Sequence, residues 1–97
     1  MIAQDLLMSS AQRALLGRVH PEIRLVKLRA IGDVIVLSVI VECEPSNRAQ
    51  EDVSEAATEI IADFPEAAKI VERFEVSNRP LPREDIHSNG WVFQRAE

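Results

Sequence analysis

The segment Val34–Val41 constrains the fold more than any other part of the chain, because every residue in it except Ser38 is aliphatic. A strand that is apolar on both faces is usually central in its sheet, or is covered on its second face by something else. The segment Ile23–Ala30 precedes it, and the turn signal Gly32-Asp33 lies between them. The two segments therefore predict a β-hairpin that forms the middle of a sheet.

Two further segments have the periodicity of amphipathic helices. Apolar residues recur at helical spacing from Leu7 to Leu15, with Ser9 or Ser10 available as an N-terminal cap and Gly17 placed for a left-handed C-terminal residue. The second helix is predicted over Arg48–Phe64, where one face is apolar: Val53, Ala56, Ala57, Ile60, Ile61 and Phe64. Both helices have one face to bury, and a sheet is the natural partner for it.

The rest of the chain supplies two more strands. Lys69–Ser77 alternates as a third strand, and Trp91–Phe93 resembles a short last one. Between them lies Asn78–Asn89, a long loop for so small a protein. The order α-β-β-α-β-(β) predicts an α+β fold, a two-layer sandwich with a mainly antiparallel sheet and the helices on one face. The length of 97 residues predicts a single domain over 1–97.

Negative charge is concentrated on the second predicted helix. The chain has 11 basic and 16 acidic residues, a formal net charge of −5. Four carboxylates at spacings of three, four and four fall on one side of this helix and are called the acidic stripe: Asp52, Glu55, Glu59 and Asp63. The stripe is either a solvated face that keeps the protein soluble or a docking surface for a basic partner, which it would attract and orient.

Composition and charge exclude several classes of function. An acidic chain is a poor candidate for binding nucleic acid or an anionic membrane, since both require a basic surface. No apolar run approaches the roughly 18 residues of a membrane span. Asp5 stands where a signal peptide needs positive charge, so we expect a cytoplasmic protein. Cys43 is the only cysteine, which excludes an internal disulfide.

The residues that could carry chemistry are isolated from one another in the sequence. His20 and His87 are single loop histidines, expected to face solvent or to cap, and Cys43 is expected to be a small buried hydrophobe. No phosphate-binding, dinucleotide-binding or metalloprotease motif is present. We therefore predict neither an enzyme nor a cofactor, and a small enzyme or metal-binding domain that uses these three residues is the weakest alternative.

Two residues near the C-terminus are candidates for binding a partner. Trp91 is the only tryptophan, and it either packs over the edge of the core or anchors a binding surface, where tryptophan is over-represented. Arg83, in the proline-bearing loop, could reach a carboxylate. Both are included with the acidic stripe as predicted contact residues.

Three stretches together resemble a known group of proteins. They run from Ala14 to Arg24, from Thr58 to Pro65 and from Trp91 to Arg95. In this order and spacing they are similar to small acidic immunity proteins of bacterial polymorphic or contact-dependent toxin systems. The resemblance spans nearly the whole chain. It implies a cytoplasmic inhibitor that binds a cognate toxin domain and blocks its active site.

The main hypothesis is therefore a non-enzymatic module that binds and neutralises a bacterial toxin domain. The resemblance implies a basic partner, to which the acidic stripe is complementary in charge. The alternative is a homodimeric structural or subunit domain, in which a second copy covers the outer face of the apolar strand Val34–Val41.

Overall fold

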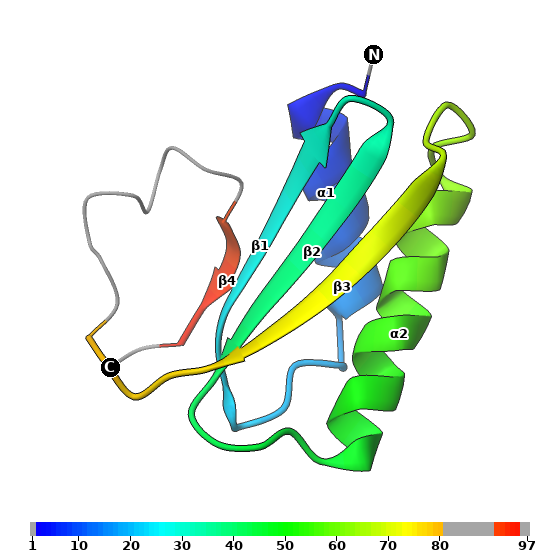
Figure 1. Ribbon diagram of the computed structural model, residues 1–97. Helices are drawn as coiled ribbons and strands as arrows, with labels where there is room; N and C mark the ends of the chain where they lie inside the picture. Colours follow the sequence, from blue (N-terminus) through cyan, green and yellow to red (C-terminus); the bar gives the residue numbers. More distant parts are fainter. Residues whose placement is uncertain (1, 81–90, 96–97) are drawn as a thin grey trace.

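The computed structural model describes residues 2–80 and 91–95. The elements follow in the order α1 (Gln4–Leu15), β1 (Ile23–Ile31), β2 (Val34–Val41), α2 (Asn47–Ala62), β3 (Lys69–Val76) and β4 (Trp91–Gln94). Both helices lie on the same side of the sheet, which gives two layers (Figure 1). The predicted α+β class and the order of elements are confirmed.

The sheet has the strand order β3-β2-β1-β4. β1 pairs antiparallel with β2 and with β4, whereas β2 and β3 run parallel. α2 connects β2 to β3 and carries the chain back along the sheet to the end at which β2 began. β3 therefore starts at that end and runs parallel to β2. The sheet is thus mainly antiparallel but mixed, and β2 is an inner strand as its composition predicts.

The two faces of β2 differ in burial. Ile35, Leu37, Val39 and Val41 point toward the helices, and each is at most 1% exposed. The residues between them on the other face, including Val36 and Ile40, are partly exposed. Only the helix side of the sheet therefore forms the core, where the hydrophobic effect contributes most.

Small residues let the two helices lie close to the sheet and to each other. α1 contributes Ala11 and Ala14 to the core, and α2 contributes Ala56 and Ala57, each at most 3% exposed. Larger aliphatic side chains from the same faces fill the space between the layers. The helical periodicity of both segments is confirmed by this burial.

The start of α1 differs from the prediction. The helix begins after Ala3, which makes no side-chain cap hydrogen bond. Ser10 lies in the middle of the helix and is only 2% exposed, and Ser9 is likewise inside it. The expectation of a serine cap was wrong, because tertiary packing extends this helix toward the N-terminus beyond its local signal.

The other turn and cap signals are reproduced. Gly17 and Gly32 have φ angles of 76° and 62°, which a side chain would strain. The Oγ atom of Ser46 accepts a hydrogen bond from the backbone N–H of Ala49 at 3.1 Å and caps α2. α2 ends at Ala62, since the next two backbone N–H groups donate to Ile60 and Ile61 in a tighter final turn.

Cys43 is a correction to the sequence-based expectation. It lies two residues beyond the end of β2 and is exposed rather than buried. The strand stops at Val41, so the alternation that buries every second residue of β2 does not extend to this position.

Candidate functional site

The acidic stripe lies on the exposed side of α2. The side chains of Glu55, Glu59 and Asp63 are 65%, 52% and 48% exposed, and that of Asp52 is 25% exposed. The α2 residues of the core lie on the neighbouring side of the helix. The stripe therefore flanks the core side of α2, with three of its four carboxylates about half exposed or more.

Arg18 contacts the middle of the stripe. It follows α1, and its Nη1 atom lies 2.5 Å from Oε2 of Glu59, while its Nη2 atom lies 3.6 Å from Oε2 of Glu55. Nη1 also donates a hydrogen bond to the carbonyl oxygen of Ala14 at 2.8 Å. The Arg18 side chain is only 24% exposed. One partly buried guanidinium thus joins the end of α1 to two carboxylates of α2.

The two ends of the stripe also have partners within the chain. At one end, the hydroxyl of Ser10 donates to Oδ2 of Asp63 at 2.6 Å, and Nη2 of Arg13 lies 3.4 Å from the same oxygen. At the other end, Nε2 of His20 lies 2.7 Å from Oδ2 of Asp52. All four carboxylates of the stripe therefore contact α1 or the segment that follows it.

These contacts give the stripe a structural role. The guanidinium groups of Arg13 and Arg18 relieve the repulsion between like charges along α2. They do not cancel it, since two arginines face four carboxylates. A net negative charge consequently remains on this side of the molecule.

The basic partners were missed by sequence reasoning, which compared charges within the second predicted helix alone. These partners lie 32 to 50 positions away from the stripe residues in the sequence. Arg13, Arg18 and His20 cluster at the end of the first helix, and this clustering was the available signal. It becomes informative only when the two helices are known to lie side by side.

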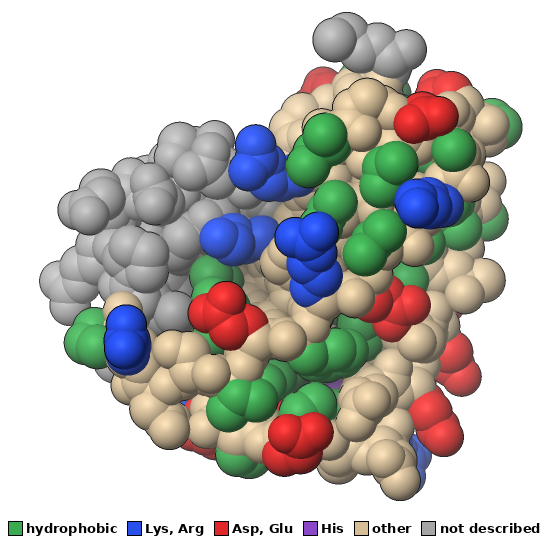
Figure 2. All heavy atoms as spheres, in the orientation of Figure 1, with side chains coloured by type: hydrophobic (Ala, Val, Ile, Leu, Met, Phe, Trp, Pro, Cys, Tyr) green, Lys and Arg blue, Asp and Glu red, His purple; other side chains and the backbone are tan. Residues whose placement is uncertain are grey.

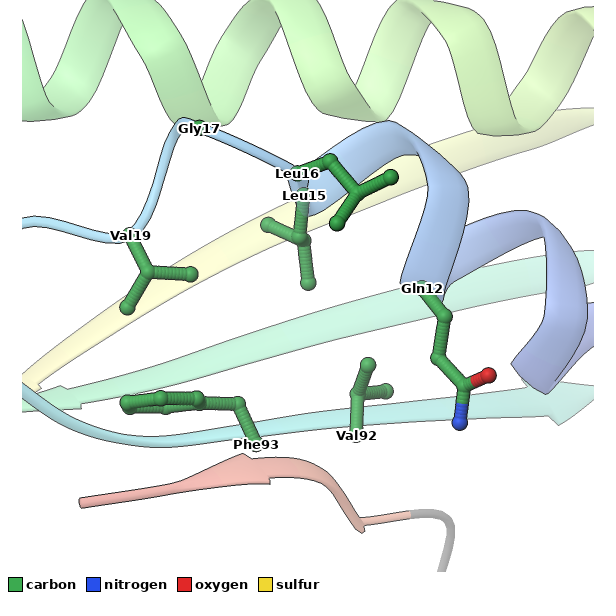
Figure 3. Close-up of a pocket in the computed structure, with 7 residues that line it drawn as sticks. All are labelled: Gln12, Leu15, Leu16, Gly17, Val19, Val92 and Phe93. Atoms are coloured by element: carbon green, nitrogen blue, oxygen red, sulfur yellow. The ribbon is translucent and has the colours of Figure 1, made fainter.

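An apolar groove adjoins the stripe. It has a volume of about 430 Å³ and lies between the end of α1 and β4. Leu15 and Val19 point from one side toward Val92 and Phe93 on the other (Figure 3). Leu16 also lines it and is 77% exposed.

The groove and the stripe lie on different sides of α1 and approach each other at the turn after this helix. Gly17 lines the groove, and the next residue, Arg18, contacts the stripe. An apolar centre beside charged side chains is the usual anatomy of a protein-binding surface. The two features were not linked in the sequence, where Leu16 and Val19 gave no signal of exposure.

The remaining predicted contact residues lie on or near β4. Trp91 is the first residue of β4, directly before Val92 of the groove, and it pairs with Lys27 of β1. Arg83 and His87 lie outside the described residues. The structure thus places the strand that begins with Trp91 along the groove and leaves Arg83 as a prediction.

The comparison with protein families identifies the chain. Residues 4–97 match the model of the MafI2 immunity protein, from the first residue of α1 to the end of the sequence. This protein belongs to the MafI2 immunity protein family. The family match confirms the resemblance to small immunity proteins that was seen in the sequence. No match is found among curated proteins.

Membership of the MafI2 family indicates an immunity function and implies a protein partner. It also suggests a role without catalysis. Over residues 2–80 and 91–95, no group of three or more histidine, cysteine, aspartate or glutamate side chains could hold a metal ion. In the same ranges, no helix is both long and apolar enough to cross a membrane.

His20 has a structural explanation in this MafI2 protein. Its ring and the Asp52 carboxylate are 21% and 25% exposed, and together they connect the loop after α1 to the first half of α2. The expectation that His20 faces solvent or caps a helix was incomplete, because the ring is mostly enclosed and bonded to a side chain. The contact adds one more link between the two helices.

Proposed function

We propose that this MafI2 protein acts in the bacterial cytoplasm by binding a cognate toxin domain and neutralising it without chemistry of its own. The observation that carries the proposal is the turn after α1, where the exposed Leu16 and its groove lie next to Arg18, which contacts the acidic stripe. Apolar burial supplies affinity in such a surface, and charge supplies rate and register.

The ion pairs that the stripe carboxylates form within the chain are compatible with toxin binding. Exposed ion pairs contribute only about 0–1 kcal/mol each, because water and salt screen them. A basic side chain of the toxin can therefore approach Glu55 or Asp63 without a large loss of internal stability. The net negative charge of the stripe would attract a basic toxin domain over a distance of about one Debye length, ~8 Å at physiological salt.

The groove is the natural place for an apolar side chain of the toxin. Leu16 and Val19 would be covered on binding, together with Val92 on β4. Trp91, the first residue of β4, and Arg83, which lies outside the described residues, are proposed as additional contacts. Burial of one large aliphatic side chain is worth about 1.5–3 kcal/mol, which exceeds the contribution of any single exposed ion pair.

The experiment uses the toxin domain encoded beside the gene and measures association and dissociation rates over a range of salt. Leu16→Glu is expected to weaken binding at least about tenfold, mainly through faster dissociation. The matched control is Leu6→Glu, since Leu6 is 61% exposed on α1 but does not line the groove. Equal affinity of the two variants would contradict the proposal.

The stripe is tested separately from the groove. Glu55→Gln is expected to slow association about two- to threefold at low salt and to leave dissociation nearly unchanged. Glu51→Gln, an exposed residue of α2 outside the stripe, removes the same charge and is the control. If both variants slow association equally, only the net charge matters and the stripe has no specific role.

The second candidate is a homodimeric domain, which is favoured by the partly exposed outer face of β2. Sedimentation at micromolar concentration tests it directly. A monomer that still binds the toxin would exclude the homodimer and support the first proposal.

A further inference from the structure

The side of the sheet that faces away from the helices has a composition opposite to that of the stripe. We call it the outer sheet face, and its side chains follow from the strand register in rows across β1, β2 and β3. One row is Ile31, Val34 and Lys69, the next is Arg29, Val36 and Val71, and the third is Lys27, Ser38 and Arg73. The fourth row contains Leu25, Ile40 and Glu75. Aliphatic and basic residues thus share the face, with Glu75 in its fourth row.

The aliphatic part of this face is accessible except at Leu25, which is 1% exposed. Ile31 is 60% exposed, and Val34, Val36, Ile40 and Val71 are all partly exposed. Figure 2 shows hydrophobic side chains with lysine and arginine side chains set among them on the side where the strands lie in front. Such a surface is costly to leave in water and is typical of a binding site.

The charge of the face is positive, although the chain as a whole is acidic. Its basic residues are Lys27, Arg29, Lys69 and Arg73, and Glu75 is its one acidic residue in the rows above. Within the part of the chain that the structure describes, Arg29, Lys69 and Arg73 are exposed and form no ion pair. The stripe carboxylates, by contrast, all have partners. The uncompensated charge that this face offers to a partner is therefore cationic.

A shallow hollow lies in the row with the highest positive charge. Its volume is about 160 Å³, and the side chains around it include Lys27, Ser38, Ile40, Arg73 and Glu75. Lys27 and Arg73 flank Ser38 on the two neighbouring strands. Arg73, which forms no ion pair within the described residues, can donate a charge-assisted hydrogen bond to a carboxylate placed over Ser38.

We propose that the outer sheet face is a second docking surface, separate from the groove and stripe, for a protein segment whose carboxylates are set among aliphatic side chains. The carboxylates would face the basic residues, and one would enter the hollow over Ser38. The aliphatic side chains would cover Val36, Val71 and Ile31. This proposal does not depend on which toxin the helix side binds.

Charge complementarity favours this occupant over the others. A second copy stacked face to face would place another positively charged face against Arg29, Lys69 and Arg73, and the repulsion between like charges is unfavourable. A nucleic acid would satisfy the cations but leave the aliphatic side chains uncovered, and the net charge of −5 opposes it. An acidic protein segment satisfies both the cations and the apolar residues.

The test uses the full chain labelled with ¹⁵N and a synthetic peptide in which glutamate alternates with valine. We expect chemical-shift changes in the amides of Val36, Ser38 and Val71, and none at Leu16 or Val19. A peptide with lysine in place of glutamate is the probe control. Arg73→Glu is expected to weaken binding of the glutamate peptide at least about threefold, whereas Arg48→Glu, at an exposed site on α2, leaves it unchanged.

Four results would overturn the proposal. The shift changes could map to the groove or stripe, the lysine peptide could bind as tightly, or Arg73→Glu could leave binding unchanged while the variant unfolds at the wild-type temperature. A DNA oligonucleotide that binds this face more tightly than the peptide would indicate a nucleic-acid site. None of these measurements uses the toxin. A negative result for the outer sheet face would therefore not bear on toxin binding.

Discussion

The guanidinium group of Arg18 lies 2.5 Å from the carboxylate of Glu59, and this contact joins two helices that are far apart in the sequence. Arg18 also donates to the carbonyl oxygen of Ala14 near the end of α1. Leu16 follows the last residue of α1, Gly17 lines the apolar groove, and Arg18 contacts the stripe. Three consecutive residues therefore connect the end of the helix, the groove and the stripe. Stability and partner binding are therefore coupled at Arg18.

Arg18→Ala is expected to lower the free energy of unfolding by about 1 kcal/mol. The variant loses two ion pairs and a hydrogen bond to an end of α1 where carbonyl groups lack helical partners. Urea denaturation at neutral pH measures the change. Arg48→Ala removes an equally charged side chain that is exposed on α2 and has no ion pair within the described residues. The interpretation of Arg18 as a link between helices requires the Arg48 variant to be clearly the more stable of the two.

Asp63→Ala is expected to destabilise the protein by about 1–3 kcal/mol. The hydroxyl of Ser10 is buried and donates to Asp63, so loss of the carboxylate leaves a buried donor without its acceptor. Asp63→Asn retains an oxygen acceptor and is expected to cost less than half as much. Thermal or urea unfolding of both variants checks the order.

A double-mutant cycle identifies Ser10 as the cause. In the Ser10→Ala background the buried donor is absent, so Asp63→Ala should cost much less than in the wild-type protein. If the cost of Asp63→Ala is the same in both backgrounds, the effect comes from Arg13 or from the end of α2 instead.

The elements of the fold were predictable because their signals are local. The aliphatic run of β2, the helical spacing in α2 and the glycines at 17 and 32 each specify a conformation within a few residues. The start of α1 was not predictable, since Ser9 and Ser10 carry a cap signal that tertiary packing overrides. The parallel pairing of β2 with β3 depends on where α2 returns the chain, which no local pattern records.

The candidate site was predictable only in part. The stripe was found because helical periodicity places four carboxylates on one side of α2. Its partners were not found, since Arg13, Arg18 and His20 approach it through tertiary structure. The groove was also missed, because whether Leu16 is buried or exposed depends on the position of β4 relative to α1. The cations of the outer sheet face alternate along β1 and β3, and only the register shows that they share one surface.

Glu22 predicts a small dependence of stability on pH. Its pKa is lowered below the ordinary 4.5, first by a hydrogen bond from its own backbone N–H, and further by the N–H of Ser46 and the charge of His20, against the opposing effect of desolvation. A lowered carboxyl pKa adds stability above the unfolded-state pKa, and this stability is lost as the pH falls through the folded-state pKa. Glu22→Gln should thus be less stable than the wild type near pH 7, with the difference disappearing below 4.5.

The measurement is urea unfolding of both proteins at neutral pH and at pH values well below 4.5. Glu22 is partly exposed, so solvent screens its interactions and the difference is expected to be a small fraction of the total stability. A difference that persists unchanged at the lower pH would show that the variant acts through packing near the Ser46 cap of α2 and not through the charge of the carboxylate.

Cys43 is expected to react with a water-soluble thiol reagent in the folded protein. It is exposed and lies beyond the end of β2, so the reagent reaches it without unfolding of the sheet. Cys43→Ser should change the free energy of unfolding by less than about 0.5 kcal/mol, since no packing is lost. Labelling that requires denaturant would show that the thiol is covered in solution. The same exposure predicts that the wild-type protein forms disulfide-linked dimers under oxidising conditions, and the Cys43→Ser variant is therefore the protein to use when its sedimentation is measured.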